Sequence, residues 1–207
     1  MRCFINLFFL LLLTVASWTN VALADFKAHF ENMASDPRPD KITRGSHYVV
    51  SNESNHHIFR PHVADKGGIF VGVGGDQLYI ISGWMKPEIL IPMDFDQYIV
   101  DLHNIYGLMF KKADNPKDFL DLWKQKNEKT IIADIKAQFP ENAKQYVKVF
   151  KFARKTVFWR LRKTRKQYKK LKIPIFLTDQ DTYTTVSNLH REGRVFPLRG
   201  DLTKDKA

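Results

Sequence analysis

Short apolar runs alternate along this chain with longer segments in which apolar residues recur at helical spacing. The run 69–73 is bounded by glycines, which is typical of a strand buried on both faces, and the run 88–93 predicts a second apolar strand that closes at Asp94. Residues 77–84 between them predict a helix. The order strand, glycine turn, helix, strand predicts a βαβ unit over residues 69–94, with a crossover long enough for parallel pairing.

Helical periodicity dominates residues 97–172. Helices are predicted from 97 to about 138, with a break at Asn115-Pro116, and one longer helix is predicted after Pro140. The apolar stripe of that longer helix consists of Val147, Phe150, Ala153, Val157, Leu161, Tyr168 and Leu171. We therefore expect a helical insertion after the βαβ unit.

Residues 173–207 predict a further strand, helix and strand. Ile175-Phe176-Leu177 indicates a short strand or extended segment, Thr178-Asp179 is a suitable cap for a helix over 181–192, and a last strand is predicted at 195–198. The chain stops soon afterwards, where an α/β protein normally places another helix and strand. The expected fold class is α/β, a Rossmann-like parallel sheet with a helical insertion, incomplete at the C-terminus. Shorter elements are expected earlier, a helix at 26–33 and a strand at 48–50.

The start of the chain has the three-part layout of a secretory signal, with Arg2, an apolar run and the small-residue pattern Ala22-Leu23-Ala24. The apolar run is shorter than the roughly 20 residues that span a bilayer, which favours a cleaved signal peptide at 1–24 over a membrane anchor. We expect a single exported domain, 25–207, in the periplasm or outside the cell. The one cysteine, Cys3, lies in the signal, so disulfides and thiolate chemistry are excluded from the mature chain.

The charge of the chain is concentrated in one place. Lys and Arg number 33 against 22 Asp and Glu, a net charge of +11, and residues 148–172 contain twelve cations and no acid. One interpretation is a long solvated helix packed by one face. The other is a docking site for an anionic membrane surface or nucleic acid, because clustered Lys and Arg are attracted to both. Phe158 and Trp159 add an aromatic edge to this basic helix.

The turn Gly72–Asp76 is the feature that most suggests ligand chemistry. Without Cβ atoms, such a turn lets backbone N–H groups and a helix N-terminus approach a nucleotide closely. Asp94 lies about 20 residues on, where a carboxylate accepts hydrogen bonds from ribose hydroxyls, and Asp96 is a second candidate. The alternative is a helix-packing turn that holds no ligand. Ser51-Asn52-Glu53 either lines the mouth of the cleft or caps the following helix.

Several stretches together resemble a poorly characterised exported bacterial family. They are 48–53, 67–74, Pro87-Glu88, Asp94 and 191–203. Members of that family resemble class I S-adenosylmethionine-dependent methyltransferases in their Rossmann-like core, and this chain is similar to a shortened member. The resemblance implies S-adenosylmethionine as cofactor, with Gly72 and Gly74 against its methionine part. It further implies that Asp94 holds the ribose and that Asp201 lies near the adenine. Asp76 belongs to the same candidate site.

The sequence departs from the family pattern at two positions, where Phe70 replaces an acid before the first glycine and Asp76 replaces the third glycine. S-adenosylmethionine is also a cytosolic metabolite, whereas this chain is expected to be exported. Two functions stay open: a methyltransferase-like protein, active or degenerate, with unknown catalytic residues, or a non-catalytic module that binds an anionic surface through 148–172. The spacing of His56, His57 and His62 matches no standard metal site, so no metal is expected.

Overall fold

The computed structural model describes residues 28–29, 34–39 and 46–201. The chain divides into two compact units, Met1–Ala34 and Ser35–Ala207. Only three described residues belong to the first unit, and two of them, Ala28 and His29, are helical. The predicted signal peptide and most of the predicted helix at 26–33 therefore lie outside the described residues.

The second unit is an α/β structure and is mostly helical. Its described residues form seven α-helices, two short 3-10 helices and one parallel sheet of three strands. In chain order the elements are a 3-10 helix His56–Phe59, α2 Arg60–Val63, β1 Ile69–Val73, α3 Gln77–Met85, β2 Ile89–Asp94, α4 Gln97–Lys112, α5 Pro116–Leu122, a 3-10 helix Gln125–Asn127, α6 Glu128–Gln138, α7 Ala143–Leu171, α8 Gln180–Arg191 and β3 Leu198–Arg199. None of these helices is both long enough and apolar enough to cross a membrane.

The sheet has the strand order β1-β2-β3. Strand β1 pairs with β2 in parallel register, from Ile69 opposite Ile89 to Val73 opposite Met93. Strand β3 pairs with the end of β2, also in parallel. The predicted βαβ unit over 69–94 is thus confirmed. Burial on both faces is wrong for β1, where Ile69, Val71 and Val73 are exposed. All six residues of the central strand β2, by contrast, are buried. A strand buried in this way explains the unbroken apolar run in the sequence.

Polar residues at the predicted breaks begin the helices. The side chains of Asp96, Asn115 and Asp179 each accept a hydrogen bond from a backbone N–H in the first turn of α4, α5 and α8, respectively. Pro116 occupies the first turn of α5, where no backbone donor is lost. Helix α3 ends at Lys86, which adopts a left-handed conformation with φ 53°. The breaks predicted from the sequence at 115–116 and 178–179 are therefore confirmed.

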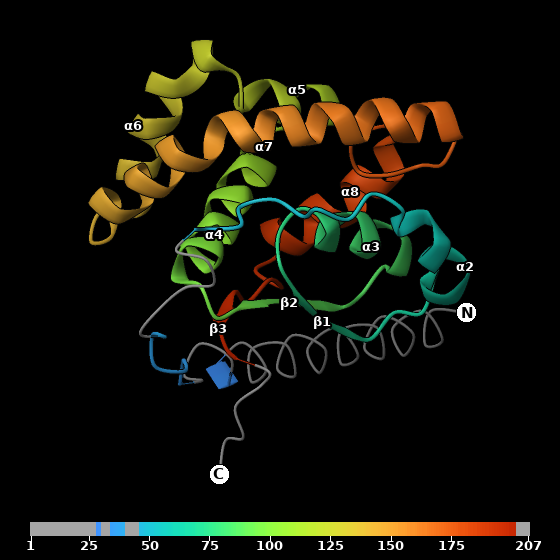
Figure 1. Cartoon of the computed structure of the whole chain (residues 1–207), viewed down its shortest axis with the longest axis horizontal. Coiled ribbons are helices and arrows are strands. Elements are labelled where there is room, and N and C mark those ends of the chain that lie inside the picture. The colour runs from blue at the N-terminus through green and yellow to red at the C-terminus, as the bar shows by residue number, and fades with distance from the viewer. Residues whose placement is uncertain (1–27, 30–33, 40–45, 202–207) are drawn as a thin grey trace, which may run out of the picture. The chain divides into compact units, whose positions relative to one another are not determined.

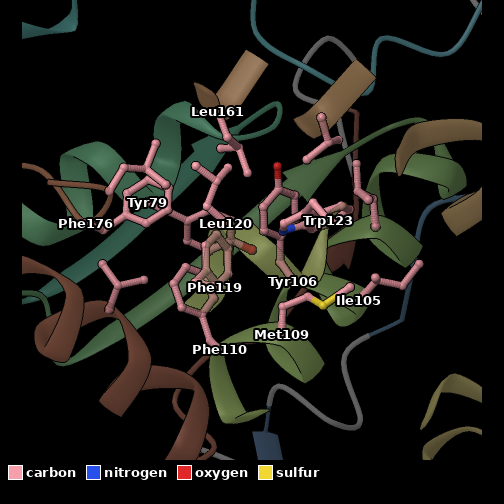
Figure 2. Packing of buried hydrophobic residues seen from close by; sticks show 14 of the residues in the cluster. Tyr79, Ile105, Tyr106, Met109, Phe110, Phe119, Leu120, Trp123, Leu161 and Phe176 are labelled. Atoms are coloured by element: carbon pink, nitrogen blue, oxygen red, sulfur yellow. The ribbon is translucent and has the colours of Figure 1, made fainter. Parts of the chain in front are cut away.

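The helices pack on the sheet and on one another around a single aromatic-rich core. Helix α3 packs against β1, α4 packs against β2 and β3, and α8 packs on α3 and α4, while α7 crosses α4, α5 and α6 (Figure 1). Figure 2 shows Tyr79, Tyr106, Phe110, Phe119 and Trp123 meeting in the middle of this layer. The ring centroids of Phe110 and Phe119 lie 4.2 Å apart. Each such buried side chain contributes about 1.5–3 kcal/mol, so this cluster holds α3, α4 and α5 together.

Three expected strands differ in the structure. Residues 175–177 form a turn rather than a strand, although all three side chains are fully buried. Residues 48–50 form no strand, and the strand expected at 195–198 is limited to Leu198–Arg199, with Val195 making one isolated bridge to β2. An apolar run in the sequence indicates that its side chains are buried, and it is as compatible with a buried turn as with a strand.

Candidate functional site

The carboxyl ends of the three parallel strands bring most of the predicted site residues to one edge of the sheet. The turn with Gly74 and Asp76 follows β1, Asp94 ends β2, and Asp201 comes two residues after β3. The N–H of Gly200 donates to the carbonyl oxygen of Asp94 at 3.1 Å, so the ends of β2 and β3 are in direct contact. In open α/β sheets, ligands bind at this edge.

The glycines of the turn are accounted for by close packing. A Cβ atom on Gly72 would lie 2.3 Å from Cδ2 of Leu78, so this glycine lets α3 approach β1. Gly74 has φ +98°, and a Cβ there would lie 2.7 Å from Nε2 of Gln77. That amide nitrogen donates to the carbonyl oxygen of Val73 at 3.0 Å. Both glycines therefore have a packing role that needs no ligand.

The carboxylate of Asp76 is fully buried and has two internal partners. One oxygen accepts a hydrogen bond from the N–H of Ser51 at 2.9 Å, and the other accepts from Nε of Arg160 in α7 at 2.9 Å. On the next glycine, Gly75, a Cβ would lie 3.4 Å from the carbonyl oxygen of Val49. The chain's own residues thus lie directly against the turn.

Residues 47–55, which we call the strap, run between the glycine turn and α7. The carbonyl oxygen of Glu53 accepts a hydrogen bond from Arg160, and that of Ser54 accepts from Nε2 of Gln167 at 2.8 Å. Within the strap, the N–H of Glu53 donates to Oγ of Ser51 at 3.0 Å, which closes a local turn. The helix-cap interpretation of 51–53 is wrong, because the following 3-10 helix begins without a side-chain cap.

Asp94 and Asp96 form a linked pair at the end of β2. Oδ1 of Asp94 accepts from the N–H of Asp96 at 2.9 Å, and Asp96 contacts Nδ1 of His47 at 2.7 Å. The His47 ring stacks on Tyr98 with centroids 3.6 Å apart. The pKa of Asp94 is raised to about 6, chiefly by burial and also by the nearby charge of Asp96, while hydrogen bonds from the backbone of Asp96 and Phe95 act in the opposite direction. Asp94 is therefore a carboxyl group that can hold or release a proton near neutral pH.

His103, which was not among the candidates predicted from the sequence, is buried and contacts the glycine turn. Nε2 of His103 lies 2.7 Å from the carbonyl oxygen of Gly74, and Nδ1 lies 2.7 Å from the hydroxyl oxygen of Tyr79. Burial lowers the pKa of His103 to about 4, so the ring is neutral at pH 7. A carbonyl only accepts, so Nε2 carries the proton and the Tyr79 hydroxyl donates to Nδ1. Its only sequence signal is a histidine on the apolar face of a predicted helix.

The remaining candidates do not converge on this edge. Three cavities bounded by described residues have volumes of about 110, 260 and 340 Å³, and none of them is lined by Gly72, Gly74, Asp76, Asp94 or Asp201. No group of three or more His, Cys, Asp or Glu side chains suited to a metal ion occurs among residues 28–29, 34–39 and 46–201. His56 is buried against Tyr168, whose hydroxyl oxygen lies 3.4 Å from its Nδ1.

Helix α7 presents a straight line of exposed side chains opposite the face that it buries. The buried side chains are Val149, Phe150, Ala153, Val157, Leu161, Thr164 and Tyr168. This largely confirms the predicted apolar stripe, although Val147 is only partly buried and Leu171 is exposed. Directly opposite that face, exposed side chains recur every three or four residues, with Arg162 and Lys163 as an adjacent pair. We call this subset of the exposed residues the outer stripe: Lys148, Phe152, Lys155, Trp159, Arg162, Lys163, Lys166 and Lys170.

The outer stripe combines cations with exposed aromatic rings, and two of the cations, Lys148 and Arg162, lie over the rings of Tyr98 and Trp159. None of its six cations makes an ion pair with a described residue. Trp159 is 52% exposed and Phe152 is 50% exposed. Phe158, which the sequence grouped with Trp159, instead packs against the core. At 1.5 Å per residue the stripe is about 33 Å long.

Two arginines of α7 have the opposite role and tether the helix. Arg154 pairs with Glu128 at 3.1 Å and donates to the carbonyl oxygen of Trp123 at 3.2 Å. Arg160 pairs with Asp76, and both arginine side chains are only 11% exposed. Of the twelve cations of 148–172, two therefore tether α7 from its inner side and six belong to the outer stripe, while Lys151, Arg165, Lys169 and Lys172 lie in neither group. Composition alone does not reveal this difference.

Comparison with known proteins assigns the chain to a family but not to a function. Residues 48–207 match the family described as Domain of unknown function (DUF7790). The chain belongs to this family. No curated protein matches the sequence. The family match covers the sheet, the glycine turn and all of α7, so both candidate sites lie in the family's domain.

Proposed function

We propose that the chain is a docking module that binds polyanionic surfaces through the outer stripe of α7. The observation that carries this proposal is the set of six exposed cations that have no ion-pair partner among the described residues, on a helix whose inner arginines are paired. A helix that needed charge only for solubility would gain as much from mixed signs, which also avoid self-repulsion.

The size and rigidity of the stripe suit an extended partner. Each Lys or Arg near an anionic surface contributes about 1 kcal/mol, so the six cations together supply at most about 6 kcal/mol before salt screening. A line about 33 Å long lets all of them face a flat surface at once. Because α7 is already fixed by its buried face and by Arg154 and Arg160, little ordering is needed on binding.

Retention of the full chain on immobilised heparin tests this proposal. The variant Lys155→Glu/Lys163→Glu/Lys166→Glu reverses three charges of the outer stripe. The matched control Lys126→Glu/Lys129→Glu/Lys136→Glu makes the same charge change at exposed lysines in and beside α6. We expect the stripe variant to elute at much lower salt than the control. Equal elution of the two variants would show that only net charge matters and would refute the proposal.

A second candidate function is the binding of a nucleotide-type cofactor at the carboxyl edge of the sheet. Asp94 favours it, because this buried carboxyl group with a raised pKa ends the central strand beside the glycine turn. The resemblance to methyltransferases names S-adenosylmethionine as the cofactor. This candidate ranks second because the carboxylate of Asp76 and the space beside Gly72 and Gly74 are already filled by internal partners.

Thermal unfolding with and without S-adenosylmethionine tests the second candidate. A ligand at about 100 times its dissociation constant adds about 2.7 kcal/mol to the stability of the folded state. A rise in Tm that is lost in Asp94→Asn supports a cofactor site at this edge. An unchanged Tm at high excess of the cofactor excludes it.

A further inference from the structure

We infer that the polyanionic surface is an anionic phospholipid bilayer, and that Trp159 and Phe152 enter its interfacial layer; this inference rests on the proposed function of the outer stripe. Both rings are about half exposed and stand on the same line as the cations. The indole of Trp159, an apolar ring with one polar N–H, favours the boundary between headgroups and acyl chains, and the wholly apolar ring of Phe152 favours burial on the acyl side of it.

The two rings are placed for simultaneous contact with a plane. They are seven residues apart, two turns of helix, which separates them by about 10 Å along one side of α7. Each has cations on the adjoining turns, and the guanidinium of Arg162 lies 5.0 Å from the centre of the Trp159 ring. Phe152 is supported from behind by Tyr98, with ring centroids 5.9 Å apart. Rings that are held in place in this way lose little freedom when they insert.

The composition and shape of the stripe favour a bilayer over nucleic acid. Five of its six cations are lysines, whose long flexible side chains spread charge over a diffuse surface and whose stems accompany an inserted ring. Sites for single-stranded nucleic acid instead combine stacking platforms with a groove that follows the backbone. The outer stripe instead lies on the exposed side of one helix, α7, which suits contact with a flat surface.

Tryptophan fluorescence of the full chain with vesicles of mixed phosphatidylglycerol and phosphatidylcholine tests the inference. Trp18 is replaced by Phe in every protein compared, so that the fluorescence comes from Trp84, Trp123 and Trp159 alone. Trp84 and Trp123 are 3% and 0% exposed, so a change at the surface is reported by Trp159, and Trp159→Phe confirms the source of the signal. We expect the emission to move to shorter wavelength and to be quenched by lipids with brominated acyl chains. Trp159→Ser should weaken vesicle binding about tenfold.

The outcomes separate this inference from the proposal on which it rests. Stripe-dependent retention on heparin without a spectral shift or bromolipid quenching would overturn the lipid inference and leave the basic docking surface standing. Tighter binding to single-stranded DNA than to vesicles, with Trp159 quenched by the bases, would overturn it in favour of nucleic acid. If the stripe and control variants eluted from heparin at the same salt concentration, both the proposed docking function and the lipid inference would lose their basis.

Discussion

Replacing Asp76 by Ala should destabilise the protein more than any single change at an exposed charge. Asp76 is fully buried and Arg160 is 11% exposed, so the variant leaves a cation without its partner and the N–H of Ser51 without its acceptor. Breaking a buried pair from one side costs about 3–5 kcal/mol. The double variant Asp76→Ala/Arg160→Met should lose less than the single variants predict together, because it removes the stranded charge. Urea unfolding followed by circular dichroism measures each value.

The exposed pair of Asp114 and Arg191 is the control for this experiment. The atoms Oδ1 and Nη2 lie 2.9 Å apart, but the Asp114 side chain is 88% exposed. Asp114→Ala should therefore cost less than about 1 kcal/mol. If Asp76→Ala cost no more than Asp114→Ala, then the contact between α7, the strap and the glycine turn would not hold the fold together, and the packing account of the turn would fail.

Three further changes test the packing and the buried titratable groups by urea unfolding. Gly72→Ala should cost about 1–3 kcal/mol, because its Cβ would lie 2.3 Å from Cδ2 of Leu78. The same substitution should cost less in a Leu78→Ala background, where the clashing methyl group is absent, and an equal cost in both backgrounds would contradict this reason. Burial raises the pKa of Asp94 from 3.8 to about 6, so the folded state binds the proton more tightly and the free energy of unfolding falls as pH rises between these values. The fall amounts to about 3 kcal/mol, and Asp94→Asn should remove it. An unchanged pH profile in this variant would contradict the assignment of the fall to Asp94. Burial lowers the pKa of His190 from 6.5 to about 3, so the free energy of unfolding falls as pH drops through this range. His190→Phe, which keeps a ring stacked on Phe110, should make this fall smaller. An equally steep pH profile in the variant would show that His190 does not cause the fall.

Local patterns in the sequence were sufficient to predict the elements that depend on neighbouring residues. Glycine-bounded apolar runs predicted β1 and β2, and their spacing predicted the parallel pairing that the structure confirms. Cap residues such as Asn115 and Asp179 predicted where helices begin. Residues 175–177 were misjudged as a strand because their burial arises from helices that pack over a turn. Apolar periodicity in the sequence indicates that residues are buried, but it does not indicate which other parts of the fold bury them.

The candidate site could be predicted from the sequence only in part. The order of strands places Asp94 and the glycine turn at one edge, and that much follows from parallel topology. The partner of Asp76 is Arg160, 84 residues away, and His103 reaches Gly74 across 29 residues. Helical spacing places Arg160 at the border of the buried face of α7, three residues after Val157, but only the packed fold shows that Asp76 is its partner.

Sedimentation with phosphatidylglycerol vesicles tests the central claim most directly, namely that the outer stripe of α7 is the binding surface. The full chain, the variant Lys155→Glu/Lys163→Glu/Lys166→Glu and the control Lys126→Glu/Lys129→Glu/Lys136→Glu are compared at rising salt. All three carry the same first 33 residues, so any contribution from them is equal. The full chain and the control should sediment with the vesicles until salt screens the charges, whereas the stripe variant should stay in solution. Equal sedimentation of the two variants would contradict the claim.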